Sequence, residues 1–204
     1  MVHPTPTVNA SLPFRTGGFR TLAEGLDYAA RGETGMCFYG NRGELEHALP
    51  YAELRARALA TAPRLLGLGL ARLDRVAIVA ETSPDFLVAF LACQYAGLVP
   101  VPLPMALSLG THRTHVERLR GMLENAGARV GLASRAFLDQ LREAAEGTAA
   151  GWIGTHEELA AVPPAAATPV PLGPEEPCYI QYSSGSTSFP RGVLVTQPAL
   201  TANA

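Results

Sequence analysis

The middle of the chain alternates between strand-like and helix-like patterns of apolar positions. Residues 75–80 form a nearly continuous apolar run, which is typical of a parallel strand buried on both faces. Helical spacing then predicts a helix over 85–95 that ends near Gly97, with Ser83 as its capping hydroxyl and Pro84 in its first turn. Two similar units follow, with strands at 99–103 and 128–133 and helices at 113–126 and 135–145. This alternation predicts an α/β fold with a largely parallel sheet flanked by helices.

Three prolines and one serine indicate where some of these elements end or lie. Pro100 and Pro102 lie within a strand pattern, so that strand is expected to be short or to lie at the edge of the sheet. Ser134 directly precedes a helical pattern and is expected to cap that helix. A further helix is predicted over 51–66, and Pro63 is expected to kink it or end it early.

The two flanks of the chain carry other patterns. Residues 19–30 have the spacing of an amphipathic helix, and the runs 36–39 and 45–49 enclose a Gly/Asn turn, as in a β-hairpin. Strand patterns resume at 178–182 and 193–196, after a stretch rich in proline and alanine. These patterns divide the chain into a loosely ordered N-terminus (1–16), an α/β subdomain (17–159), a linker (160–177) and the start of a further sheet, expected to be truncated (178–204).

Composition narrows the function classes only slightly. The chain has 204 residues, 48% of them hydrophobic and 17% charged, enough to bury a core as one large domain or two small ones. A net charge of −2 gives no reason to expect a nucleic-acid partner. The longest apolar run, near 86–96, is too short to cross a bilayer, and no secretory signal is evident at the N-terminus. A cytoplasmic protein without a transmembrane segment is expected.

Cysteine and histidine positions predict neither a disulfide framework nor a metal site. Cys37, Cys93 and Cys178 are odd in number, far apart and close to apolar runs, so buried free thiols are expected. His112 and His115 lie three residues apart near a helix start, but no third ligand accompanies them, so they are expected at the surface.

The most informative stretch runs from Gln181 to Val193. An apolar run leads into five hydroxyl residues around Gly185, and a proline, Arg191 and Gly192 follow before the next strand pattern. A strand, a Ser/Thr/Gly loop and a second strand are typical of a phosphate-binding turn, because glycine permits close backbone approach and N–H groups and hydroxyls donate to the anion. The interval between the two glycines is too long for a Walker loop, and no lysine follows. A solvent-exposed Ser/Thr turn is the alternative interpretation.

This stretch resembles the signature loop of the adenylate-forming superfamily, which includes acyl- and aryl-CoA synthetases, peptide-synthetase adenylation domains and luciferases. The leading Gln181-Tyr182 and the lack of a lysine before Gly192 resemble most the fatty-acyl-AMP ligase branch. Two positions depart from the pattern: Ser188 replaces the usual second glycine, and Arg191 stands where most members have lysine. Two further elements resemble the same superfamily, at 49–54 and at 91–102. Together they indicate the N-terminal subdomain of an adenylate-forming enzyme.

The resemblance implies ATP-dependent activation of a fatty acid, with Mg²⁺ as the metal and acyl carrier protein or coenzyme A as the acceptor. The acid's carboxylate would attack the α-phosphate of ATP and form an acyl-adenylate and pyrophosphate. The loop and its neighbours would wrap the β- and γ-phosphates: Ser183, Ser184, Gly185, Ser186, Thr187, Ser188, Arg191 and Gly192. No catalytic residue or metal ligand is assigned. The superfamily's catalytic lysine has no counterpart, because all sixteen basic residues of this chain are arginine. We therefore expect an N-terminal portion of a larger enzyme that is inactive alone.

Two other interpretations stay open. One is a non-catalytic α/β binding or assembly module derived from the same fold, which Ser188 favours modestly because it makes the loop less permissive in φ. The other is a stand-alone nucleotide-binding protein, which would need an adenine site that the resemblance places further along such enzymes. A partial sheet is also expected to expose apolar surface and to dimerise or aggregate.

Overall fold

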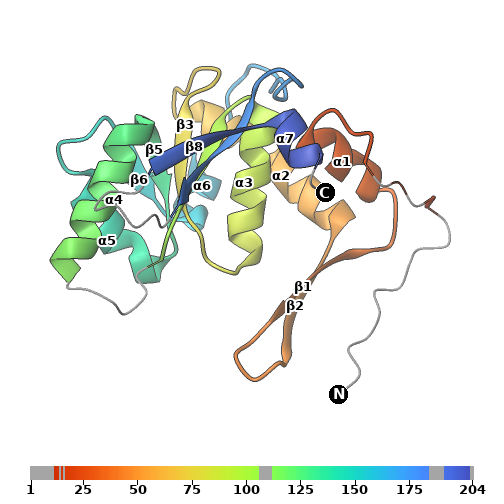
Figure 1. Ribbon diagram of the computed structural model, residues 1–204, viewed down its shortest axis with the longest axis horizontal. Helices are drawn as coiled ribbons and strands as arrows, with labels where there is room; N and C mark the ends of the chain where they lie inside the picture. The colour runs from red at the N-terminus through yellow and green to blue at the C-terminus, as the bar shows by residue number, and fades with distance from the viewer. Residues whose placement is uncertain (1–11, 14, 16, 106–111, 184–190, 203–204) are drawn as a thin grey trace.

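Four parallel strands form the central sheet of the molecule (Figure 1). The computed structural model describes residues 12–13, 15, 17–105, 112–183 and 191–202. The strand order is β4–β3–β5–β6, for β3 (Arg75–Val79), β4 (Val99–Leu103), β5 (Ala128–Leu132) and β6 (Trp152–Gly154). Each pairing is parallel, which confirms the predicted sheet, and β4 lies at its edge as its prolines indicated.

Helices cover both faces of this sheet. α2 (Tyr51–Gly67) and α3 (Pro84–Ala96) lie on one face, and α4 (His112–Ala126) and α5 (Arg135–Ala145) on the other (Figure 1). Alternate residues of β3 account for both layers, because Val76 and Ile78 pack with α2 and α3 while Ala77 and Val79 pack with α4 and α5. Among the described residues, no helix combines the length and the apolar character needed to cross a bilayer.

The ends of α3 follow the sequence prediction. Ser83 Oγ accepts a hydrogen bond from the Phe86 N–H at 3.3 Å, and Pro84 occupies the first turn. Gly97 ends the helix in the left-handed conformation, with φ of 73°. The helix is apolar on nearly all sides because it lies between the sheet and α2.

The predicted early end of a helix at Pro63 is wrong. α2 continues through Pro63 to Gly67. Proline at this position removes the hydrogen bond that would reach the Leu59 carbonyl one turn earlier. Leu59 itself is 38% exposed, so the loss falls on the solvent-facing side of the helix.

The predicted hairpin is present and extends away from the body of the molecule (Figure 1). It pairs β1 (Gly35–Tyr39) with β2 (Leu45–Pro50) in antiparallel fashion. A two-stranded sheet has no second layer on its outer face, and Cys37 is therefore exposed. The prediction of a buried thiol is wrong for Cys37 and confirmed for Cys93 and Cys178.

Several short elements were not predicted, or begin later than predicted. α1 (Leu22–Ala29) begins after Thr21, whose hydroxyl caps it. β6 and α6 (His156–Ala161) have three and six residues, too few for a periodic pattern. The side chains and backbone N–H groups of Thr155 and Glu158 bond reciprocally and fix the start of α6.

The proline- and alanine-rich segment 160–177 lies against the body of the molecule. Arg72 donates hydrogen bonds to the Val170 and Pro171 carbonyls, and its guanidinium pairs with Glu176. Leu172 within this segment is buried. The division of the chain into domains stays a prediction.

The last strands form a separate two-stranded sheet, of β7 (Pro177–Ser183) and β8 (Arg191–Thr196), followed by α7 (Gln197–Thr201). β7 runs beside β4, but among the described residues no strand ladder joins the two sheets. Val99 of β4 donates to the Asp74 carbonyl beside β3, so Pro100 and Pro102 direct their nitrogen atoms away from β3. Since proline has no N–H, β4 offers β7 no donor at these two positions.

Candidate functional site

The β7–β8 hairpin places the two flanks of the Ser/Thr/Gly stretch side by side. Tyr182 pairs with Gly192, and Ser183 pairs with Arg191, so the strands flank the stretch as predicted. Five of the predicted site residues lie outside the described residues, and their role stays a prediction: Ser184, Gly185, Ser186, Thr187 and Ser188. Ser183, Arg191 and Gly192 are placed at the tip of the hairpin.

Helix α4 holds this tip. The Tyr182 hydroxyl donates to the Met122 carbonyl at 3.0 Å and lies 2.8 Å from Asn125 Oδ1. Burial raises the pKa of Tyr182 to about 12, so the phenol stays protonated and remains a donor at neutral pH. Only 8% of Tyr182 is exposed, which places these bonds in the core between β7 and α4.

Gly192 is a glycine because of close packing at the same tip. A Cβ atom there would lie 3.2 Å from Asn125 Oδ1, from Ile180 Cγ2 and from Tyr182 Cε1. That spacing is tighter than ordinary van der Waals contact, so a side chain there would require these neighbouring atoms to shift by a few tenths of an ångström. Asn125 therefore touches both flanks of the stretch, a role that no local sequence pattern revealed.

Arg191 supplies an available positive charge beside the stretch. Its side chain is exposed and makes no ion pair with any residue that the structure describes. Arginine presents several N–H donors in a planar fork, which suits binding to phosphate oxygens.

An acidic side chain of the chain itself lies near the customary ligand crevice of an open α/β sheet. Ligands bind in such sheets at the carboxyl ends of the strands where the strand order reverses, here between β3 and β5. Glu81 follows β3, and its carboxylate accepts hydrogen bonds from Ser134 Oγ at 2.8 Å and from the Ser134 N–H at 3.2 Å. Ser134 is the N-cap residue of α5, as predicted, but its side chain makes no capping bond to the helix, and its hydroxyl donates to the carboxylate of Glu81.

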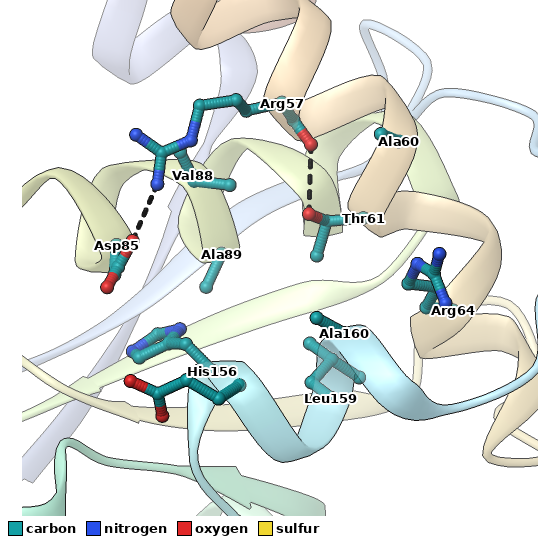
Figure 2. A pocket seen from close by; sticks show the side chains of 11 residues that line it. Arg57, Ala60, Thr61, Arg64, Asp85, Val88, Ala89, His156, Leu159 and Ala160 are labelled. Carbon is teal, nitrogen blue, oxygen red and sulfur yellow. Dashed lines mark hydrogen bonds and ion pairs between the residues drawn. The ribbon is translucent and has the colours of Figure 1, made fainter.

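A cleft of about 330 Å³ opens between α2, α3 and α6 (Figure 2). Val88, Ala89 and Leu159 form its apolar floor, while Arg57 and Asp85 pair across its rim at 2.6 Å. Thr61 turns its hydroxyl back onto the Arg57 carbonyl.

His156 also lines this cleft (Figure 2). Its pKa is lowered by burial, which outweighs the opposing effects of Asp85, Glu157 and Glu81. The cleft is lined from helices on the face of the sheet opposite to α4, and none of the described site residues, Ser183, Arg191 and Gly192, lines it.

The histidines near the start of α4 behave as surface groups. The ring of exposed His112 lies 2.8 Å from the Glu143 carboxylate, and partial burial lowers the pKa of His115. Within the described part of the chain, no group of three His, Cys, Asp or Glu side chains could hold a metal ion.

Comparison with known proteins decides the family. The model of the family described as "AMP-binding enzyme" matches residues 32–204, which is most of the chain. The chain belongs to this family. AMP-binding membership confirms the resemblance drawn from the loop and from the two elements at 49–54 and 91–102.

Individual AMP-binding relatives are similar along nearly the whole chain. It is 42% identical over 200 residues to a protein of Caulobacter vibrioides (strain NA1000 / CB15N) named "Putative acyl-CoA synthetase", covering 98% of this chain and 34% of the relative. A structure from "Structural and Functional Studies of Fatty Acyl-Adenylate Ligases from E. coli and L. pneumophila" matches with a TM-score of 0.87 at 41% identity, covering 94% of this chain and 34% of that chain. ATP-bound MatB from Rhodopseudomonas palustris matches with a TM-score of 0.70 at 26% identity, covering 90% of this chain and 36% of the MatB chain.

These structural matches confirm the α/β fold of an adenylate-forming enzyme. The chain spans about a third of the length of the relatives it matches. The AMP-binding family uses ATP, in line with the ATP-bound MatB structure.

Proposed function

We propose that this chain carries the phosphate-binding part of an enzyme that activates a fatty acid with ATP. ATP supplies an electrophilic α-phosphate, which the carboxylate of the acid attacks as pyrophosphate leaves. The chain's own contribution is to bind and neutralise the β- and γ-phosphates. Hydroxyls and N–H groups of residues 183–188 donate to phosphate oxygens, and Arg191 pairs with their charge.

The unpaired Arg191 at the tip of a fixed hairpin is the observation that carries this proposal. An exposed cation with no acidic partner among the described residues is free to bind an anion. It lies directly across from Ser183, the first residue of the hydroxyl-rich stretch. α4 holds Tyr182 and Gly192, so the two flanks keep a constant separation, and a preorganised site loses less entropy on binding.

Mg²⁺ is part of the proposal only as a partner of the nucleotide. The described residues offer no ligand set for a metal ion, so the ion would enter with the phosphates of ATP. A cytoplasmic location also belongs to the proposal, since Cys93 and Cys178 are buried free thiols and suit a reducing compartment.

The substrate class is proposed from the relatives and from the loop. A fatty acid is proposed because a 41%-identical structure belongs to a study of fatty acyl-adenylate ligases, and because Gln181-Tyr182 resembles that branch. Coenzyme A and acyl carrier protein remain the two candidate acceptors.

A chimaeric enzyme tests the proposal. Residues 1–204 would replace the matching third of the fatty acyl-adenylate ligase with TM-score 0.87, and fatty-acid-dependent ATP–pyrophosphate exchange would be measured. We expect exchange by the chimaera and none by the 204-residue chain alone. Arg191→Ala should lower the exchange about tenfold or more, whereas Arg191→Lys should retain most of it, since a lysine also binds phosphate. Arg113→Ala, which removes an exposed pair with Glu117 on α4, is the matched control.

A folded but inactive chimaera beside an active host would refute the catalytic proposal. That outcome would favour the non-catalytic α/β module. Exchange by the 204-residue chain alone would show that the missing lysine is not needed.

A further inference from the structure

A buried glutamine pair holds the base of the β7–β8 hairpin. Gln94 of α3 and Gln197 of α7 are 1% and 0% exposed, and they lie among apolar neighbours. Placing a carboxamide in such surroundings costs free energy unless its donors and acceptors are bonded. Both side chains are bonded: Gln197 Nε2 donates to Gln94 Oε1 at 2.9 Å.

The pair reaches both strands of the hairpin. Gln94 Nε2 donates to the Cys178 carbonyl of β7 at 2.7 Å. Gln197 directly follows the last residue of β8, and its Oε1 accepts from the Leu22 N–H of α1 at 3.0 Å. Burial raises the pKa of Cys178 to about 12, so its thiol keeps its proton and faces Gln94 Oε1 as a weak donor at 3.7 Å. One carboxamide from α3 thus fixes the beginning of β7 and the end of β8 together.

The hairpin depends on these contacts because the main sheet does not hold it. Pro100 and Pro102 remove the N–H groups that β4 would direct toward β7, and no ladder joins the two sheets. The hairpin is attached to α4 at its tip, through Tyr182 and Asn125, and to α3 at its base, through Gln94. Figure 1 shows β7 and β8 lying across the strands between these two helices.

We propose that Gln94, acting with Gln197, is a positioning residue for the phosphate-binding stretch. It sets where the β7–β8 hairpin lies against the sheet, and hence where residues 183–191 meet the phosphates. The effect on phosphate binding rests on the proposed function. The placement of the hairpin does not, and it can be measured without any ligand.

Two readouts on the 204-residue chain test it. The first is amide hydrogen exchange, comparing hairpin amides such as those of Ile180 and Leu194 with sheet amides such as that of Ile78. The second is the affinity for inorganic pyrophosphate and for ATP, measured by calorimetry under conditions where each variant is fully folded. The variants are Gln94→Leu, Gln197→Leu and both together. Gln140→Leu is the matched control, because the buried Oε1 of Gln140 on α5 has no hydrogen-bond partner among the described residues.

Gln94→Leu removes the bonding partners of the Cys178 carbonyl and of Gln197 Nε2, while Gln197 Oε1 still accepts from the Leu22 N–H. We expect hairpin amides to exchange about tenfold faster relative to the sheet, and pyrophosphate affinity to fall about tenfold. Gln140→Leu should change neither quantity. The two glutamine substitutions should not be additive, because the side chains share one hydrogen bond.

A general loss of stability would look different. The positioning proposal is refuted if Gln94→Leu speeds hydrogen exchange equally in the hairpin and in the sheet. It is also refuted if the wild type binds pyrophosphate and the folded Gln94→Leu variant binds it equally well. If the wild type binds neither pyrophosphate nor ATP, the proposed function fails instead, and the exchange ratio still decides whether Gln94 places the hairpin.

Discussion

Removing one oxygen atom from the hairpin tip should destabilise the protein measurably. Tyr182→Phe keeps the ring, which packs with α4, and deletes a hydroxyl that lies 3.0 Å from the Met122 carbonyl and 2.8 Å from Asn125 Oδ1. The Met122 carbonyl lies within α4 and Asn125 is exposed, so both acceptors can reach other donors, and the variant loses chiefly the net contribution of the hydroxyl's own hydrogen bond. A hydrogen bond contributes about 0.5–1.5 kcal/mol net to stability, so we expect a loss of about 1 kcal/mol.

Tyr179→Phe is the matched control for this experiment. Tyr179 lies on the same strand and stacks its ring edge-on against Phe90 at 5.6 Å, but its hydroxyl has no hydrogen bond to any described residue. Urea unfolding would be followed by the fluorescence of Trp152, the single tryptophan, which packs against the core. With a slope of about 2–3 kcal/mol/M, Tyr182→Phe should lower the midpoint by about 0.5 M and Tyr179→Phe by much less.

Equal midpoints for the two variants would refute the reasoning. That result would mean that the tip of the hairpin is held by packing alone, and that the polar contacts with α4 contribute nothing net. A changed slope would instead indicate that the substitution alters the unfolded state or the two-state character of the transition.

Three further predictions concern a glycine, two histidines and an open edge. Gly97→Ala should cost about 2–4 kcal/mol in urea unfolding, because it combines a positive φ with a Cβ only 2.8 Å from the Val170 carbonyl oxygen, whereas Gly147→Ala, with a positive φ and open space, should cost about 1 kcal/mol. Burial lowers the pKa of both His156 and His115, so their contribution to stability is present above about pH 6.5 and is lost as the pH falls through the lower folded-state values. The melting temperature should therefore fall between pH 7 and 5, and should fall less when both histidines are replaced by asparagine. Since the outer edge of β8 is unpaired and mostly exposed in the described structure, sedimentation velocity should detect dimers or larger species, and a monodisperse monomer would contradict this.

Local patterns in the sequence predicted the frame of the fold well. The continuous apolar run at 75–80 gave β3, because a strand covered on both faces has no polar side. Ser83 and Gly97 marked the ends of α3, because capping hydroxyls and left-handed glycines act within a single turn. These signals need no knowledge of distant residues.

Contacts between distant residues could not be predicted in this way. Gln94 and Gln197 are 103 positions apart, and Gln94 registered in the sequence only as an interruption of an apolar run. Ser134 shows the same limit, because its hydroxyl donates to the carboxylate of Glu81, which is 53 positions away in the sequence. The Ser134 hydroxyl donates to a charged acceptor, which makes a strong hydrogen bond, and only the fold brings Glu81 close enough.

The carboxylate of Glu81 supports the proposal that phosphate binds at the β7–β8 hairpin and not at the parallel sheet. In many α/β proteins the crevice between the reversing strands receives a phosphate at a helix N-terminus, but here an acidic side chain already accepts the Ser134 N–H at the start of α5. A second anion at that position would meet a negative charge and would have to displace two hydrogen bonds. The proposal therefore assigns anion binding to the β7–β8 hairpin, which side chains of α3 and α4 hold in place. In this proposal the hydroxyls of the stretch contact the phosphates. Gln94, Asn125 and Gly192 do not, but the position of the hairpin, and hence the geometry of the site, depends on them as well.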